Sequence, residues 1–332
     1  MRILAAASAA LLSSSAWSAE IVDVRKVWDR GETNAFTDLM WHQDRWYCVF
    51  REGKAHVSAD GILRVVESRD GGSWTSRAEI RLDGADLRDA KITRTPTGEF
   101  LLTGAARFPD GGAVRYQSMS WLSRDAVSWS AAMRVGDPEF WLWRVTWKGR
   151  DGYSIGYSTW PDRNRRTIRL YRTRDGKPFE TIVPDLGIAN SPGENTIRFR
   201  ADGTAVCLLR RDPYAGKPPI PAERATAMIG TAPAPYGKWT WKDTGVRVGG
   251  PNFIELPDGR MVAAVRLHDG KTRTSLCWMD AGAGSLREFL ALPSAGDSSY
   301  AGLVFRDGLL WVSYYSTHEG KTAIYLARVR LP

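Results

Sequence analysis

Six polar or ionisable residues recur at intervals of roughly fifty residues, each at the start of a short apolar segment. A carboxylate beside a tyrosine can accept the phenolic proton and make the oxygen nucleophilic. Two carboxylates can instead cleave a glycosidic bond as acid and base. One Asp or Asn in such a place often caps a turn, but a set meeting at one opening predicts an active or binding site. The six residues are Asp38, Asp89, Arg144, Glu194, Asn252 and Tyr300.

A second, basic set ends the apolar segment that follows in several of these units. A guanidinium at a strand end can make a forked contact with a carboxylate, although a solvated strand end is the alternative interpretation. If both sets face one opening, the basic residues would hold an anionic ligand beside the carboxylates and the tyrosine. This second set consists of Arg51, Arg107, Arg210, Arg266 and His318.

A repeated turn motif indicates which elements position these side chains. Each copy has a hydroxyl residue, Arg and Asp, a turn, and then an aromatic residue. The Asp can accept hydrogen bonds from turn amides, and the aromatic ring can pack on the sheet beside the turn. The copies are Ser68–Trp74, Ser123–Trp129 and Thr173–Phe179, with a degenerate fourth at Pro235–Trp239.

Between these turns, short apolar runs alternate with Gly or Asp breaks, and no long stretch has a helical period. This pattern predicts an all-β, six-bladed β-propeller with four-stranded antiparallel blades. The units begin near residues 34, 84, 138, 190, 248 and 296. The last unit is one strand short, so we expect the segment 21–28 to complete it and close the ring.

The composition narrows the environment and the partners. The chain of 332 residues has a formal net charge of +9, with Lys and Arg dispersed rather than clustered, which argues against nucleic-acid binding. Residues 1–19 have the pattern of a signal peptide, so we expect residues 20–332 to form one secreted or periplasmic domain without membrane insertion.

We expect this domain to be a monomer. The three cysteines, Cys48, Cys207 and Cys277, lie in apolar runs and are interpreted as small buried hydrophobes.

Three segments resemble the sialidase (neuraminidase) superfamily of six-bladed propellers. The repeated turn, which reads Ser-Arg-Asp-Gly-Gly-Ser-Trp at Ser68–Trp74, resembles its Asp-box, or BNR repeat, and Tyr300-Ala-Gly-Leu-Val-Phe-Arg-Asp-Gly is similar to the stretch around its catalytic tyrosine. The segment from Glu194 to Arg210 is similar to its paired Glu and Arg. The chain departs from the family at Phe36-Thr37-Asp38-Leu39, where the family has Arg-Ile-Pro.

The resemblance implies an exported glycosidase that removes a terminal acidic sugar. Tyr300 would be the nucleophile, Glu194 its base and Asp60 the acid/base. Arg210 and Arg266 would hold the substrate carboxylate, and Arg51 or Arg144 could replace the missing family arginine. Asn252 and His318 would complete the substrate-binding set.

Three alternatives stay open. An inverting glycosidase would use Asp38, Asp89 and Glu194 as its carboxylates. A polysaccharide lyase would use a Tyr or His base and an Arg or a metal to neutralise a uronate, with His42, His56 and His318 as the candidate histidines. A non-catalytic propeller would only bind glycans. No His/Cys metal-ligand set is visible, so we expect no cofactor, with a structural calcium on turn carboxylates as an open option.

Overall fold

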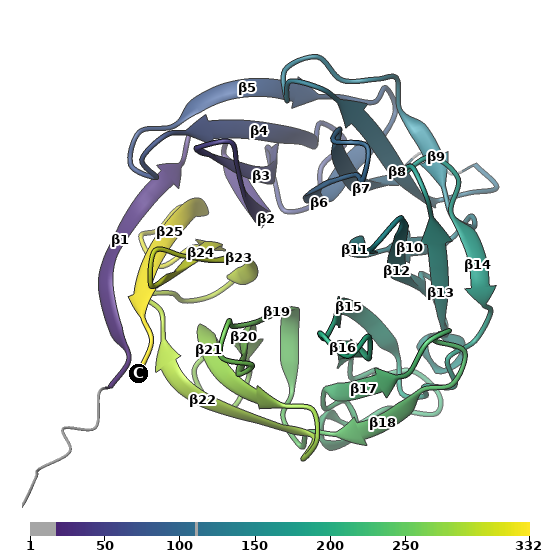
Figure 1. Ribbon diagram of the computed structural model, residues 1–332. Coiled ribbons are helices and arrows are strands. Elements are labelled where there is room, and N and C mark those ends of the chain that lie inside the picture. Colours follow the sequence, from purple (N-terminus) through teal and green to yellow (C-terminus); the bar gives the residue numbers. More distant parts are fainter. Residues whose placement is uncertain (1–17, 110–111) are drawn as a thin grey trace, which may run out of the picture.

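The computed structural model describes residues 18–109 and 112–332, and it shows six antiparallel sheets arranged as blades around a central axis (Figure 1). The predicted all-β six-bladed propeller is confirmed. The first three blades, each given from the inner strand outward, are β2 (Thr33–His42), β3 (Arg45–Gly53), β4 (Ile62–Ser68) and β5 (Thr75–Ile80); β6 (Asp86–Arg94), β7 (Phe100–Arg107), β8 (Tyr116–Ser123) and β9 (Met133–Val135); and β10 (Phe140–Leu142) with β11 (Thr146–Lys148), then β12 (Asp151–Ser158), β13 (Ile168–Thr173) and β14 (Glu180–Val183).

The other three blades contain four strands each. They are β15 (Pro192–Phe199), β16 (Ala205–Arg211), β17 (Met228–Ala232) and β18 (Thr240–Asp243); β19 (Val248–Glu255), β20 (Met261–Leu267), β21 (Arg273–Asp280) and β22 (Ser285–Ala291); and β23 (Ser299–Arg306), β24 (Leu309–Ser316), β25 (Ala323–Arg330) and β1 (Glu20–Trp28).

The ring is closed by its two chain ends, as predicted. Strand β1 pairs antiparallel with β25 and becomes the outer strand of the last blade. Arg328 on β25 reaches Asp23 on β1 with an Nη2–Oδ2 distance of 2.6 Å. Because the first strand pairs with the last, the sixth blade has four strands like its neighbours, and the ring is closed.

The repeated motif forms hairpin turns between the third and fourth strands of a blade. In the first turn, Asp70 Oδ1 accepts hydrogen bonds from the Gly72 and Ser73 amides at 2.8 and 2.9 Å. These amides lower the pKa of Asp70 to about 2. Asp125 accepts the equivalent bonds in the second blade, at 2.9 and 2.8 Å. The Asp of this motif therefore has a structural role, which is to hold the turn.

The core consists of apolar side chains packed between neighbouring sheets. Between the first two blades, for example, Val49 and Leu63 meet Leu87 and Leu102, and all four are fully buried. The three cysteines are free and buried, in agreement with their interpretation as small hydrophobes.

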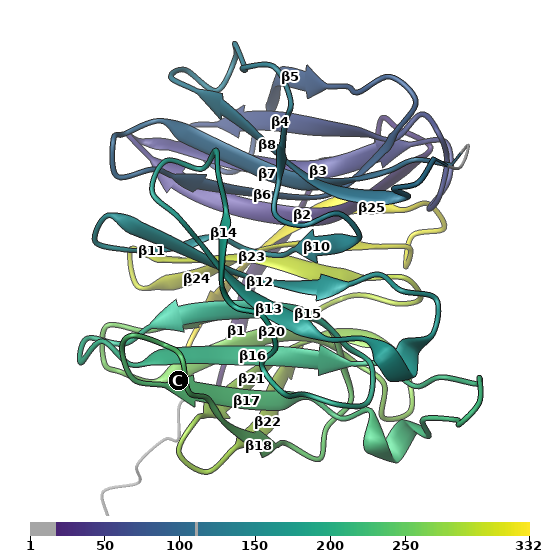
Figure 2. The same cartoon turned by 90° about the vertical axis from the view of Figure 1, so that its right-hand side faces the viewer.

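Loops between the second and third strands of the blades carry the short 3₁₀ helices η1 (Arg163–Arg165) and η2 (Ala222–Arg224), which protrude from one face of the ring (Figure 2). In the first blade the corresponding loop covers residues 54–61. Among the residues described, no helix is long and apolar enough to cross a membrane. Residues 1–17 of the predicted signal peptide lie outside the described residues.

Candidate active site

The inner strands of five blades begin with a β-bulge, and this bulge decides which side chains meet. The pairing register slips between Ala35 and Asp38 on β2, and at the corresponding point of β6, β15, β19 and β23. In four of these strands the residue inside the bulge has a positive φ. These residues are Phe36 (63°), Asp89 (54°), Gly250 (54°) and Tyr300 (53°).

Relative to these bulges, the six predicted inner-strand residues do not occupy equivalent positions. Asp89 and Tyr300 lie inside their bulges, whereas Asp38 and Asn252 lie two residues past the positive-φ position. Because a bulge redirects the side chains beside it, these residues occupy different levels of the channel. The sequence spacing aligned Asp38 and Asn252 with Asp89 and Tyr300, although the first two stand two residues further along their strands relative to the bulge.

Tyr300, Glu194 and Arg210 form one hydrogen-bonded cluster. The Tyr300 hydroxyl donates to Glu194 Oε1 at 2.5 Å, and Arg210 Nη1 donates to Glu194 Oε2 at 2.7 Å. The same Arg210 nitrogen lies 3.0 Å from the Tyr300 hydroxyl oxygen. The Gly250 amide also donates to Glu194 Oε2, at 2.9 Å. Three separate blades thus hold the Glu194 carboxylate against the phenol.

Electrostatics favour the protonated form of this tyrosine. Burial raises the pKa of Tyr300, and the adjacent Glu194 carboxylate raises it further, although Arg210 and Arg266 oppose the shift. The phenol therefore holds its proton in the resting state and directs it at a carboxylate that can accept it. Removal of this proton as a bond forms at the oxygen is how a base activates a weak nucleophile.

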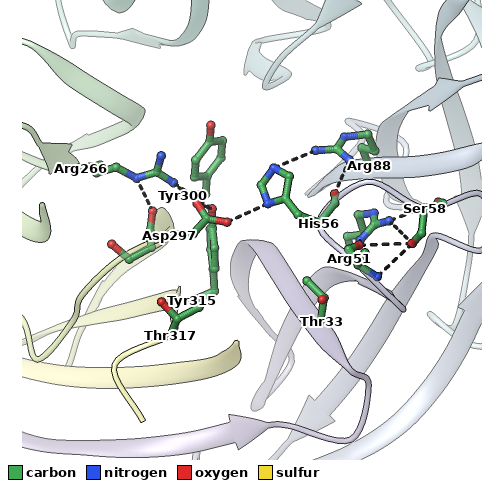
Figure 3. Close-up of polar contacts among 12 residues, drawn as sticks. Thr33, Arg51, His56, Ser58, Arg88, Arg266, Asp297, Tyr300, Tyr315 and Thr317 are labelled. Atoms are coloured by element: carbon green, nitrogen blue, oxygen red, sulfur yellow. Dashed lines mark hydrogen bonds and ion pairs between the residues drawn. The ribbon is translucent and has the colours of Figure 1, made fainter. Parts of the chain in front are cut away.

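Arg266 lies beside Tyr300 (Figure 3). Its Cζ is 5.2 Å from the ring centroid, which allows a cation–π contact. Its Nη2 donates to Asp297 Oδ1 at 2.8 Å and to the Tyr315 hydroxyl at 2.9 Å, and Nε donates to the Ser298 carbonyl at 2.8 Å. Its Nη1 makes no hydrogen bond to the described residues, so it is free to meet a ligand.

His56 extends from the 54–61 loop toward this cluster (Figure 3). Its Nδ1 lies 2.8 Å from Asp297 Oδ2, and its ring packs edge-on against Phe36 at 5.2 Å between centroids. Arg88 Nη1 donates to the His56 carbonyl at 2.6 Å. Hydrogen bonding to His56 and the charge of Arg266 lower the pKa of Asp297 despite its burial, which acts in the opposite direction.

Sequence reasoning did not single out Arg88, Asp297 or Tyr315. Asp297 precedes Tyr300 by one short turn, and Arg88 adjoins the predicted Asp89, so proximity to predicted residues was the signal available. Tyr315 had no such signal, because its role depends on the pairing of β24 with β23.

Asp89 is buried close to the cluster and lacks a partner at one oxygen. Its Oδ1 makes no hydrogen bond within the described chain. Burial raises the pKa of Asp89, and the Glu194 charge adds to this, while Lys91 and Arg88 act in the opposite direction. Burial therefore favours the protonated form of the Asp89 carboxyl group.

Asp38, Arg144 and Asn252 lie deeper in the channel and connect the blades. Asp38 Oδ1 pairs with Arg144 Nη1 at 2.6 Å, and Asp38 Oδ2 accepts from the Ile92 amide at 3.0 Å. Arg144 Nη2 and Asn252 Nδ2 both donate to the Ala301 carbonyl at 2.9 Å. These contacts support the inner strands rather than reach the Tyr300 hydroxyl.

The remaining predicted residues lie apart from the cluster. Arg51 is fully buried, and its Nε donates to Asp86 Oδ1 at 2.8 Å. Asp60 is exposed and accepts from the Lys54 amide at 3.2 Å. His318 packs on the Tyr325 ring at 4.8 Å between centroids. The cluster therefore unites Tyr300, Glu194, Arg210 and Arg266 with His56, Asp297 and Tyr315.

Comparison with solved structures identifies the fold. A protein of unknown function from Dyadobacter fermentans shares 16% identity at a TM-score of 0.81, covering 95% of this chain and 100% of its own. A Penicillium chrysogenum alpha-L-arabinanase complexed with arabinobiose shares 12% identity at 0.70, covering 92% and 98%. A Trypanosoma rangeli sialidase shares 9% at 0.70, covering 90% and 55%. This chain has the six-bladed propeller fold of these glycosidases. No family model and no curated protein sequence matches it.

Proposed function

We propose that the chain is an exported glycoside hydrolase that removes a terminal acidic sugar from a glycan with Tyr300 as its nucleophile. The observation that carries this proposal is the Tyr300–Glu194 hydrogen bond of 2.5 Å, with Arg210 bound to both side chains. Fold similarity to a sialidase and to an arabinanase agrees with the proposal but does not specify the sugar. Export rests on the predicted signal peptide.

The reaction proceeds in two steps. Tyr300 Oη attacks the anomeric carbon while its proton passes to Glu194, and the bond from that carbon to the glycosidic oxygen breaks. An acid protonates the departing oxygen. In the second step, water attacks the anomeric carbon, Glu194 returns its proton to Tyr300 Oη, and the conjugate base of the acid takes the water proton. Two inversions at one carbon give net retention.

His56 is better placed than Asp60 to supply the leaving-group proton. Both residues belong to the 54–61 loop, but His56 faces the cluster and Asp60 contacts Lys54 at the outer surface. Asp297 holds His56 Nδ1 at 2.8 Å, as a carboxylate does when it orients a catalytic imidazole. We assign the protonated imidazole of His56 as the acid and Asp297 as its positioning residue; His56 Nε2, which lies 3.5 Å from Arg88 Nη2, must leave that contact to donate its proton.

Preference for an acidic sugar follows from the guanidinium groups beside Tyr300. Arg210 and Arg266 flank the tyrosine, and Arg266 has an unused Nη1 donor. A guanidinium with free donors in a partly buried site favours a carboxylate ligand. The arginines also lower the energy of a phenolate that develops as Tyr300 loses its proton.

A second scheme is supported by the raised pKa of Asp89. In it, Asp89 would protonate the leaving oxygen, Glu194 would activate water, and the anomeric configuration would invert. Tyr300 would then only position Glu194.

Replacement of Tyr300 by Phe separates the two schemes. On a panel of aryl glycosides that includes sialic acid and uronic acids, we expect Tyr300→Phe to lower kcat/KM by about a thousandfold or more. The matched control is Tyr314→Phe, which removes the hydroxyl of a buried neighbour that donates to the Pro293 carbonyl at 3.0 Å. Near-wild-type turnover by Tyr300→Phe would refute the tyrosine scheme and favour the two-carboxylate one.

A further inference from the structure

The central channel contains a cavity of about 380 Å³ below the Tyr300 cluster. Its wall is formed by inner strands, including β2, β6, β15 and β23. Five charged side chains line it, and only one of them is acidic. They are Asp38, Lys91, Arg144, Arg198 and Arg306.

The single carboxylate cannot neutralise the cations of this cavity. Asp38 is already bound to Arg144 Nη1 at 2.6 Å. Lys91, which is 4% exposed, donates only to the carbonyls of Asp89 and Ala90, at 3.2 and 3.1 Å, and lies 4.7 Å from the Trp143 ring centroid. Within the part of the chain that the structure describes, no carboxylate forms an ion pair with Lys91 or Arg198.

Some hydrogen-bond donors in this cavity also lack an acceptor among the described residues. Arg144 is 5% exposed, yet its buried Nε has no partner among the described residues. Arg198 donates to the Phe253 carbonyl at 3.0 Å, and its other contacts, to Thr146 and Asn252, are long at 3.4 Å. Buried charges are normally paired, and buried donors normally have acceptors. An anion in the cavity would supply a countercharge for these cations and an acceptor for these donors.

We propose that this cavity binds a small inorganic anion, such as chloride or an oxyanion, through Lys91, Arg144 and Arg198. The volume of about 380 Å³ accommodates a hydrated halide or a phosphate-sized ion. Burial is the main cause of the lowered pKa values of Lys91, at about 8, and Arg198, at about 10. The charge of Arg144 lowers both values further, whereas Asp89 raises that of Lys91 and Asp38 raises both.

The anion would stabilise the strands that hold the candidate active site without contacting the reacting atoms. Lys91 follows Asp89 by two residues on β6, and Arg144 donates to the carbonyl next after Tyr300 in the chain. A bound anion would therefore stabilise the native state as any ligand that prefers it does. This site is independent of the proposed glycosidase activity.

Thermal unfolding in chloride tests the proposal. At constant ionic strength, exchange of sodium gluconate for sodium chloride should raise the Tm by on the order of a few degrees, with phosphate and sulfate as parallel arms. Arg198→Met should abolish this rise. The control, Arg124→Met, removes an exposed arginine whose side chain is 90% accessible and should preserve it. General salt effects act on both variants alike. Equal responses in wild type and Arg198→Met would overturn the proposal.

Diffraction from wild-type crystals soaked in bromide provides a test that needs no variant. We expect an anomalous peak in the channel within hydrogen-bonding distance of Lys91 and of a guanidinium. Bromide found only at the outer surface would overturn the proposal. If Arg198→Met fails to fold, Lys91→Met replaces it in the thermal measurement, with the same expectation.

Discussion

Gly250→Ala offers the sharpest test of how the fold positions Tyr300. Gly250 has a φ of 54°, and a Cβ added there would lie 2.7 Å from Tyr300 Cδ2 and 2.9 Å from the Tyr300 backbone nitrogen. The left-handed backbone costs an alanine about 1–2 kcal/mol. Overpacking against the ring and backbone of Tyr300 adds about 1–3 kcal/mol. We therefore expect the free energy of unfolding to fall by about 2–5 kcal/mol.

Urea denaturation measures this loss, and the preceding residue supplies the control. A Cβ on Gly249 would meet its nearest atom, Arg266 Cβ, at 3.4 Å, an ordinary contact. Gly249→Ala should therefore change the free energy of unfolding by less than about 1 kcal/mol. Because the Gly250 amide also holds Glu194, Gly250→Ala should lower turnover as well. Equal stability of the two variants would refute the close approach of Gly250 to Tyr300.

Three further predictions concern the channel and the core. Asp38→Asn leaves Arg144 buried without its 2.6 Å partner and should cost about 3–5 kcal/mol in urea denaturation; a loss below about 1 kcal/mol would contradict this role. The buried thiols, whose pKa values burial raises (Cys277 to about 12), should not react with a thiol reagent in the native state and should give three equivalents in denaturant. Burial lowers the pKa of Lys91 to about 8 from 10.5, so between these pH values the unfolded chain binds more protons. The stability of wild type relative to Lys91→Met should therefore rise from pH 8 to 10.5, and a flat difference would contradict it.

The fold could be predicted from the sequence because its signals are local. Turns with a capping Asp recur along the chain, and Asp70 and Asp125 each accept two turn amides as expected. Strand alternation and the short last unit indicated closure by the first strand, and β1 pairs with β25. The turns and the strand alternation are set by residues near one another in the chain, whereas the closing pair joins its two ends.

The candidate site was less predictable because it depends on bulges and loop directions. On β23 Tyr300 lies inside the bulge between Ser299 and Gly302, whereas on β2 Asp38 lies just past the bulge, so equal spacing did not give equal orientation. Arg51 was expected to bind substrate, but it pairs with Asp86 of the next blade, a partner that only the tertiary structure reveals. Likewise, His56 and Asp60 lie only four residues apart in one loop, and the direction of the loop decides that His56 faces the cluster.

Covalent trapping tests most directly whether Tyr300 attacks the sugar with Glu194 as its base. The probe is a fluorinated analogue of the sugar that the glycoside panel identifies, and the labelled peptide is located by mass mapping. We expect a sugar adduct on the peptide that contains Tyr300, and no adduct in Tyr300→Phe. An adduct on another residue, or an inverted product by NMR with no adduct, would refute nucleophilic attack by Tyr300.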